Sequence, residues 1–512
     1  MLAIIQSSTV FGIDSYLVRV EVDIAGGLPA YSTVGLPDAA VKESKDRVKA
    51  AIKNSDFEFP SKRITVNLSP ADVKKEGPAF DLPVAIGILA ATNQIKSEKL
   101  KEYAVVGELS LDGTVQKING ALPIALGVKR EGLKGLILPY FNSDEAGVVD
   151  GIDVIPVKDL FETIKFLEGE KEIARYRVNL NEIFDTNKNY ELDFSDVKGQ
   201  EQAKRALEVA AAGGHNVIMV GPPGSGKTML AQRFPTILPD ISLEEALETT
   251  KIHSVAGTLV SGKGLIAVRP FRSPHHTVSH IALTGGGQYP KPGEVSLAHH
   301  GVLFLDELPE FSRNALEVLR QPLEDGVVTV SRAAASLTYP ARFMLTAAMN
   351  PCPCGYYGDP FHECRCSPNQ IHRYRSKVSG PLLDRIDIHL DVPAVKFKDI
   401  SSRVPAESSA EIKLRINKAR DIQEKRFRNN KKIFCNSHMG HKDIKKYCEI
   451  DEISLNLLKD AIQKMGFSAR AYDRILKVSR TIADLEGSES IQQQHILEAI
   501  QYRSLDRGEN KF

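Results

Sequence analysis

A glycine-rich loop near the middle of the chain carries the side chains with the clearest chemistry. It consists of Gly221, Pro222, Pro223, Gly224, Ser225, Gly226, Lys227 and Thr228. Glycines allow backbone N–H groups to curl around phosphate oxygens, and a helix that starts there directs its positive end toward them. The amine of Lys227 would reach the β- and γ-phosphates, and the hydroxyl of Thr228 would ligate Mg²⁺. The loop therefore predicts binding of ATP with Mg²⁺.

Three polar residues follow two further apolar runs. Asp306 and Glu307 come directly after residues 302–305, and Asn350 ends the run 342–349. Asp306 would hold Mg²⁺ through water, Glu307 would orient the attacking water, and Asn350 would bond that water or the γ-phosphate. A buried strand with a solvated acidic end, and an asparagine that caps a turn, are the alternatives. The occurrence of Asp306, Glu307 and Asn350 in the same chain as the glycine-rich loop favours a site of ATP hydrolysis over these alternatives.

These residues need strands and helices to position them. The apolar runs 217–220, 302–305 and 342–349 predict strands, and residues 229–234 predict a helix directly after the loop. Nearer the N-terminus, residues 16–22 read as a strand and 38–54 as a helix. Residues 402–508 have a helical pattern with few glycines. The chain is therefore expected to be a multidomain α/β protein.

Four of the six cysteines fall within 15 residues, in the spacing C-x-C-x₉-C-x-C. They are Cys352, Cys354, Cys364 and Cys366. Glycine and proline make this segment a loop, and two close thiolate pairs could enclose a tetrahedral Zn²⁺. Free thiols and a reversible disulfide remain alternatives. Cys435 and Cys448 are expected to be ordinary buried or surface thiols.

Two long runs, 269–287 and 292–310, carry a resemblance to a known family. Their sequences are RPFRSPHHTVSHIALTGGG and PGEVSLAHHGVLFLDELPE. Together with the glycine-rich loop they resemble the ComM/YifB subfamily of the Mg-chelatase-like AAA+ ATPases, over essentially the whole chain. The resemblance implies an N-terminal Lon-protease-like α+β domain, a central AAA+ P-loop αβα core and a C-terminal helical lid.

The same resemblance assigns roles to two arginines. Arg385, within Pro381–Asp387, matches the arginine finger that reaches the γ-phosphate of a neighbouring subunit, and Arg470 matches the second sensor arginine. Residues 196–200 match the segment that borders the adenine. Without the family, either arginine would read as a surface ion-pair partner. A finger that acts between subunits requires an oligomer, and the family implies a homo-hexameric ring.

Two loops could face DNA in such a ring. They are residues 273–287, which resemble the family's helix-2 insert, and the predicted hairpin 327–339 with Arg332 near its tip. Both could instead pack between subunits. His275 and His276 are not read as metal ligands, because no spaced partner completes a set. From 411 to 446 the chain has 12 Lys or Arg against 4 Asp or Glu, a net charge of +8, which favours either a solvated face or a nucleic-acid surface.

The N-terminal region resembles Lon-like proteases without their catalytic residues. The matching positions hold Ala79 and Leu122, which supply neither a nucleophile nor its base. We therefore expect an inactive scaffold for ring assembly or DNA contact. The expected domains are 1–168 (inactive Lon-protease-like), 169–194 (linker), 195–395 (ATPase core with the inserts and the four-cysteine loop) and 396–512 (helical lid).

The amino-acid composition excludes several classes of protein. The 512 residues have a net charge of +1, which excludes a wholly basic, histone-like binder. The N-terminus has no basic signal-peptide region, and the longest apolar stretch, 82–95, is too short to span a membrane. Six cysteines are too few for a secreted disulfide scaffold. A cytoplasmic protein without a membrane partner is expected.

The function that these features favour is an ATP-dependent, hexameric DNA motor of the helicase or branch-migration type. It would bind single-stranded or branched DNA with low sequence specificity and act in recombination or natural transformation. A metallochelatase-like ATPase subunit and a protein-remodelling AAA+ ATPase are the alternatives, and an ATP-dependent protease is disfavoured by Ala79 and Leu122.

Overall fold

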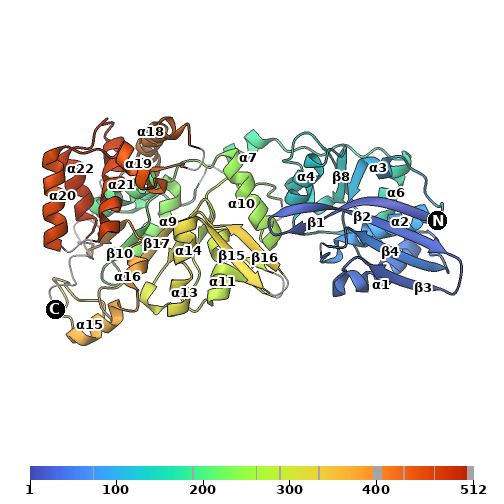
Figure 1. The fold of residues 1–512 in the computed structure, drawn as a ribbon, viewed down its shortest axis with the longest axis horizontal. Coiled ribbons are helices and arrows are strands. Elements are labelled where there is room, and N and C mark those ends of the chain that lie inside the picture. Colours follow the sequence, from blue (N-terminus) through green and yellow to red (C-terminus); the bar gives the residue numbers. More distant parts are fainter. Residues whose placement is uncertain are drawn as a thin grey trace. The chain divides into compact units, whose positions relative to one another are not determined.

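The computed structural model describes residues 1–72, 74–186, 190–260, 262–287, 290–332, 335–395, 406–430, 433–465 and 468–503. The chain divides into two compact units (Figure 1). One unit comprises Met1–Asn187 together with Leu243–Ala267, and the other comprises Lys188–Ser242 together with Val268–Phe512.

The first unit is built on a seven-stranded mixed sheet. Its strand order is β3-β4-β2-β1-β5-β8-β9. The strands are β1 (Leu2–Phe11), β2 (Asp14–Ala25), β3 (Ala30–Val34), β4 (Arg63–Ser69), β5 (Tyr103–Val105), β8 (Gly135–Pro139) and β9 (Asp153–Val157), and a separate ribbon joins β6 (Glu108–Leu109) to β7 (Val115–Gln116). β1 and β2 pair antiparallel over their length, whereas β5, β8 and β9 run parallel. The strand expected over 16–22 is confirmed within β2.

The first unit also contains eight described α-helices. They are α1 (Ala39–Asn54), α2 (Asp81–Ala91), α3 (Lys99–Glu102), α4 (Ala121–Arg130), α5 (Ser143–Ala146), α6 (Leu160–Glu168), α7 (Leu180–Thr186) and α10 (Leu243–Ala256). The side chain of Asp38 accepts from the Val41 N–H and caps α1, so the helix expected over 38–54 is confirmed. α2 is buried all round, which explains its lack of a polar face.

Two segments join the first unit although the sequence pattern separates them from it. α10 packs on α4, where the Ser254 hydroxyl bonds Glu145 and the Ser254 carbonyl accepts from Gly120 N at 3.3 Å. After α6, the Tyr176 N–H donates to the Val154 carbonyl at 2.9 Å, so part of the polar stretch expected to be a linker is bonded to β9. The periodicity of hydrophobic residues predicts whether a segment is a helix or a loop, but it does not predict the surface on which that segment packs.

The second unit contains a five-stranded parallel sheet in the order β11-β14-β17-β10-β18. The strands are β10 (Val217–Val220), β11 (Phe271–Arg272), β14 (Val302–Leu305), β17 (Met344–Met349) and β18 (Ile388–Asp391). β10 and β14 are buried at every residue, as the apolar runs predict. β17 lies between β14 and β10, so all three expected strands are neighbours.

Short elements and helices surround this sheet. Two ribbons pair β12 (Gly285–Gly286) with β13 (Lys291–Pro292) and β15 (Val327–Arg332) with β16 (Ala335–Pro340). The helices before the C-terminal region are α8 (Glu201–Gly213), α9 (Lys227–Ile237), α11 (His280–Thr284), α12 (Glu294–Leu297), α13 (Arg313–Glu317), α14 (Arg320–Asp325), α15 (Pro368–Arg375) and α16 (Gly380–Leu383). The hairpin expected over 327–339 is confirmed in backbone register, Val327 facing Pro340.

The C-terminal region is helical, as its sequence predicts. It contains α18 (Ser409–Phe427), α19 (His441–Tyr447), α20 (Glu452–Met465), α21 (Ala469–Leu485) and α22 (Gln493–Gln501). α18 and α21 both pack on α8, so the apolar faces of the tail and of the sheet unit share one core. Among the described helices, none combines the length and apolar character that crossing a bilayer requires.

Candidate functional site

The glycine-rich loop joins β10 to α9, at the carboxyl end of the central strands. A Cβ on Gly221 would lie 2.1 Å from the Val392 carbonyl oxygen, so only glycine fits there. Gly224 and Gly226 have φ angles of +74° and +85°, which side chains rarely adopt. α9 begins at Lys227, and its N-terminus is therefore directed at the loop.

The Lys227 amine is enclosed by neutral oxygens. Its Nζ donates to the carbonyls of Gly221 at 2.7 Å and Pro222 at 2.9 Å. It also lies 3.4 Å from Asn350 Oδ1. Burial lowers the pKa of Lys227, and the carboxylate of Asp306 opposes that shift. The Lys227 Nζ also lies 3.3 Å from the Ser225 hydroxyl, so its hydrogen-bond partners among the described residues are all neutral oxygens. A buried amine with neutral partners gains from an anion, so this residue fits a phosphate group.

Thr228 and Asp306 form a pair of oxygen donors beside the loop. The Thr228 hydroxyl donates to Asp306 Oδ2 at 2.8 Å. The other carboxylate oxygen accepts from the backbone N–H of Glu307 at 2.9 Å, which fixes its orientation. Hydroxyl and carboxylate oxygens are the ligands that Mg²⁺ takes beside a phosphate, so the two residues fit that ion.

Glu307 has an exposed carboxylate and a left-handed backbone, with φ +52°. Its side chain is 57% exposed, and its Oε2 lies 3.2 Å from Nδ1 of His276. His276 also packs against His275, with ring centroids 4.0 Å apart. The contact of His276 with Glu307 is not predicted from the sequence. No spacing rule connects residues 31 positions apart, so the sequence holds no signal for it.

Asn350 follows β17, between the strands that end at the glycine-rich loop and at Asp306. Its amide oxygen faces Lys227, and its backbone hydrogen-bonds Tyr374 of α15. Burial raises the pKa of Tyr374 to about 12, so this hydroxyl is neutral at physiological pH. The structure thus brings five predicted side chains together: Lys227, Thr228, Asp306, Glu307 and Asn350.

The segment predicted to border the adenine also contacts the loop. The Gln200 side-chain amide donates to the Ser225 carbonyl, and Asp196 pairs with Arg233 of α9 at 2.8 Å. Gln200 itself has a φ of +58°. The segment is therefore attached to the loop and to its helix.

Arg385 and Arg470 lie together in a different place. Both line a cavity of about 160 Å³ whose described lining is Leu323, Glu324, Arg385, Arg470, Asp473, Arg474 and Lys477. Arg385 donates to the Pro381 carbonyl at 2.7 Å and pairs with Glu324. Its side chain is only 10% exposed, whereas Arg470 in the first turn of α21 is exposed. Residues of the glycine-rich loop are not among this described lining.

Asp387 fixes one wall of the arginine cavity. Its buried carboxylate pairs with Arg474 and accepts from His215 at 3.3 Å and from the Asn216 N–H at 3.2 Å. Burial pushes the pKa of Asp387 up, but Arg474 and His215 hold it well below its usual value. The ionised carboxylate therefore anchors α21 to the base of the sheet.

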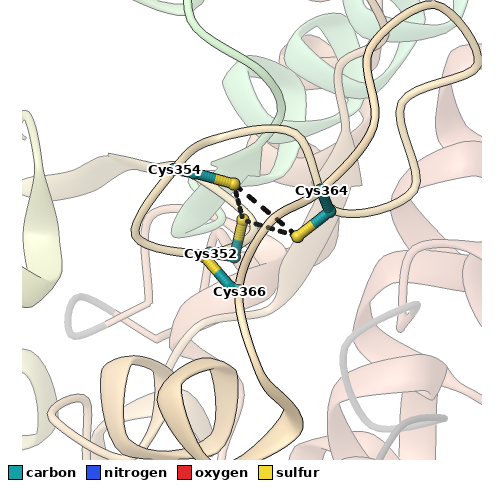
Figure 2. A group of neighbouring side chains, drawn as sticks. All are labelled: Cys352, Cys354, Cys364 and Cys366. Carbon is teal, nitrogen blue, oxygen red and sulfur yellow. Dashed lines mark hydrogen bonds between the residues drawn. The ribbon is translucent and has the colours of Figure 1, made fainter.

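The four clustered cysteines converge in the loop between β17 and α15. Figure 2 shows their sulfurs directed toward one centre. The Sγ atoms are 3.3 Å apart for Cys352 and Cys354, 3.7 Å for Cys352 and Cys364, and 3.6 Å for Cys354 and Cys364. All four sulfurs lie within 4.8 Å of one another, and all six cysteines of the chain are free thiols.

The cysteine cluster is electrostatically uneven. Backbone N–H groups of Tyr356 and Arg365 lower the pKa of Cys354 to about 6. A backbone N–H from Cys354 favours ionisation of Cys366, but burial and the neighbouring thiols raise the pKa of Cys366 to about 12. Ionisation of one thiol therefore disfavours ionisation of its neighbours. Cys435 and Cys448 are buried elsewhere, as predicted.

The remaining predicted residues are placed as follows. Arg332 ends β15, but its side chain lies outside the described part of the structure. Ala79 lies in a short 3₁₀ turn, Pro78–Phe80, and Leu122 is fully buried in α4. Several cations of the basic segment have internal partners: Lys413 with Asp240, Arg415 with Glu208, and Arg426 with Asp484. The +8 count therefore overstates the free positive surface.

Fold and site together define a class, a multidomain α/β protein whose parallel sheet carries a glycine-rich phosphate loop. Comparison with known families agrees with it. Residues 193–400 match the family described as magnesium chelatase, subunit ChlI, residues 20–142 match subunit ChlI of Mg-chelatase, and residues 406–503 match the C-terminal part of subunit ChlI.

Relatives that match over the full length of the chain identify the subfamily within this class. The chain is 45% identical to the uncharacterized protein YifB of Escherichia coli over 507 residues, covering 99% of this chain and 98% of the relative. It is 44% identical to competence protein ComM of Haemophilus influenzae over 509 residues, again covering 99% and 98%. The magnesium-chelatase subunit ChlI of Olisthodiscus luteus is 26% identical over 225 residues, covering 42% of this chain and 60% of the relative. The chain belongs to the ComM/YifB subfamily of the Mg-chelatase-like proteins.

Proposed function

We propose that this protein is an ATP-dependent DNA motor that hydrolyses ATP between the subunits of a homo-hexamer. The observation that carries the proposal is the separation of two sets of residues. Lys227, Thr228, Asp306, Glu307 and Asn350 surround the phosphate loop, while Arg385 and Arg470 line another cavity. A second copy that brings its arginine cavity to the phosphate loop would complete the site.

Each side chain then has a defined task. Lys227 and the loop amides bind the β- and γ-phosphates, and Thr228 and Asp306 hold Mg²⁺, which neutralises charge on the phosphates. Glu307 orients the attacking water, and Asn350 positions the γ-phosphate. Arg385 of the adjoining copy exchanges Glu324 for the γ-phosphate, so that its charge stabilises the transition state. Arg470 lies in the same cavity and assists from the same side.

DNA is the proposed substrate of the motion. The family includes a protein named for competence, which supports a role in natural transformation or recombination. The β15–β16 hairpin with Arg332 and the α11 segment are the proposed contacts, because hairpins of this kind reach phosphates without reading sequence. We propose the first unit as an inactive Lon-like scaffold, and the helices from α18 onward as a lid.

A metallochelatase-like ATPase subunit is the second candidate. The matches to magnesium chelatase subunits favour it, although the ChlI relative from Olisthodiscus luteus covers only 42% of this chain. Remodelling of protein substrates, driven by the same ATPase core, is the third candidate function. Both alternatives share the ATPase chemistry and differ in what stimulates it.

Stimulation by DNA distinguishes these candidates. The ATPase rate of the full chain is measured with Mg²⁺ and either forked DNA, single-stranded DNA or no DNA, over a salt series. We expect DNA to raise the rate several-fold and its affinity to fall as salt rises, because phosphate contacts release counterions. An ATPase rate that is the same with and without DNA would remove the motor proposal and leave ATP hydrolysis to the alternatives.

A further inference from the structure

The four-cysteine cluster has the dimensions of a single-metal site. Thiolates at about 2.3 Å from a tetrahedral Zn²⁺ stand about 3.8 Å from one another. The Sγ separations among Cys352, Cys354 and Cys364, 3.3 to 3.7 Å, approach that value, and Cys366 Sγ lies within 4.8 Å of the other three. A disulfide would place two sulfurs about 2.05 Å apart, which none of these pairs approaches.

The surrounding loop is shaped to hold thiolates. The backbone N–H groups of Tyr356 and Arg365 bond the Cys354 sulfur, and the Gly355 N–H donates to the Cys352 carbonyl at 3.0 Å. Cys352 is fully buried, and the other three sulfur-bearing residues are partly buried. Backbone donors around a metal-bound sulfur fix its orientation and compensate its charge.

This loop also touches the phosphate loop. Gly355 has a φ of +87°, and a Cβ there would lie 2.6 Å from Cδ of Pro223. Cys352 stands two residues after Asn350, the side chain that faces Lys227. The cluster therefore begins beside one residue of the candidate ATP site and packs on another.

The helix that follows Cys366 also contacts the backbone at Asn350 and Pro351. Ser367 caps α15 directly after Cys366, and this helix carries Tyr374, whose hydroxyl bonds the Asn350 backbone. Arg375 at the end of α15 donates to the Pro351 carbonyl at 3.0 Å. The loop and the helix thus form a closed path that starts and ends at Asn350.

We propose that Cys352, Cys354, Cys364 and Cys366 bind one structural Zn²⁺, and that the ion braces Pro223 and Asn350 in the ATP site. Four ligands close the coordination shell, so the ion supplies rigidity and not catalysis. Without it, the freedom of a glycine-containing loop would loosen the contact of Gly355 with Pro223. The metal site stands by itself, whereas the effect on nucleotide binding rests on the proposed function.

Metal content tests the site directly. Zinc is measured by mass spectrometry in the reduced full-length chain, in Cys364→Ser/Cys366→Ser, and in two controls, Phe361→Ala at the exposed tip of the same loop and Cys448→Ala elsewhere. We expect about one zinc per chain in the wild type and controls, and less than about a tenth in the double variant. The site is wrong if the wild-type chain carries less than about a tenth and its metal-free form gives no tetrahedral cobalt–thiolate absorption with Co²⁺.

The effect of zinc on the rigidity of the phosphate loop is tested in the absence of ATP. Amide hydrogen exchange over residues 221–226 and 350–354 is compared before and after zinc is withdrawn from the wild-type chain with a chelator, and again after zinc is restored. This avoids dependence on a variant that could misfold. We expect exchange at least about tenfold faster without the metal and recovery on its return. Unchanged exchange over residues 221–226 would overturn the brace, whether or not the chain hydrolyses ATP.

Discussion

The phosphate loop and the arginine cavity differ in how their charges are balanced. At the loop, one amine, Lys227, is held by neutral oxygens, with the carboxylate of Asp306 nearby. Among the described residues that line it, the arginine cavity has four cations, Arg385, Arg470, Arg474 and Lys477, against two carboxylates, Glu324 and Asp473. The first region can hold a triphosphate, and the second has positive charge that its own lining does not balance.

Under the proposed function, this difference would make one chain alone a poor ATPase. Charge that develops on a γ-phosphate is stabilised best by fixed cations on several sides. The loop supplies one side, and the cavity holds arginines that are paired with Glu324 or exposed to solvent. Assembly of copies would place one region against the other, and nucleotide binding would strengthen assembly by the same contacts.

Removal of the proposed finger should produce the largest effect. We expect Arg385→Ala to lower kcat for ATP by about 10³-fold while nucleotide affinity changes little, because the lost charge acts on the transition state. Arg313→Ala, which removes an exposed arginine of α13, is the matched control. Steady-state ATPase assays at saturating ATP measure the change. A kcat within threefold of the wild type would show that Arg385 is only the ion-pair partner of Glu324.

Glu307→Gln tests the other region. The variant should bind ATP and hydrolyse it at least about 10²-fold more slowly, because an amide cannot accept a proton from the attacking water as the carboxylate can. Glu317→Gln, in a surface pair with Arg320, controls for loss of a carboxylate. Binding of a fluorescent ATP analogue and the hydrolysis rate are measured on the same samples. Loss of binding instead of turnover would assign Glu307 a structural role beside His276.

A smaller effect, on the free energy of unfolding, is expected from Asp387, whose contribution depends on pH. Arg474 and His215 hold the pKa of Asp387 below its unfolded value of about 3.9, so its contribution is present at neutral pH and lost as pH falls below about 4. The difference in unfolding free energy between wild type and Asp387→Asn should shrink as pH falls below 4, with a slope that approaches about 1.4 kcal/mol for each pH unit. Urea unfolding from pH 7 to pH 3 measures it, with Asp325→Asn on the exposed end of α14 as control. A difference that does not change with pH would contradict the ion pair.

Much of the phosphate-loop region could be predicted from sequence. The apolar runs 217–220, 302–305 and 342–349 became neighbouring strands, so residues at their carboxyl ends had to meet at one edge. The sequence therefore predicts that Lys227, Asp306 and Asn350 lie close together at that edge. Glycines 221, 224 and 226 were predictable because the backbone needs them.

The arginine cavity was less predictable. The family resemblance singles out Arg385 and Arg470, but nothing in their spacing predicts that Glu324 pairs with Arg385 or that Arg474 pairs with Asp387, since those contacts join distant segments. The cysteine spacing predicts a cluster and not its contact with Pro223. The packing of α10 in the first unit is equally a tertiary property, because its sequence interrupts the other unit.

Mixing two inactive variants tests the central claim most directly. Glu307→Gln retains Arg385, and Arg385→Ala retains Glu307, so a site shared between one of each can be intact although neither pure variant has one. ATPase activity is measured for equal mixtures assembled with Mg²⁺ and nucleotide. We predict recovery of up to about a quarter of the wild-type rate, since random assembly joins an intact loop to an intact finger at about one interface in four. A mixture no more active than the pure variants, under conditions where they co-assemble, would contradict a site shared between copies.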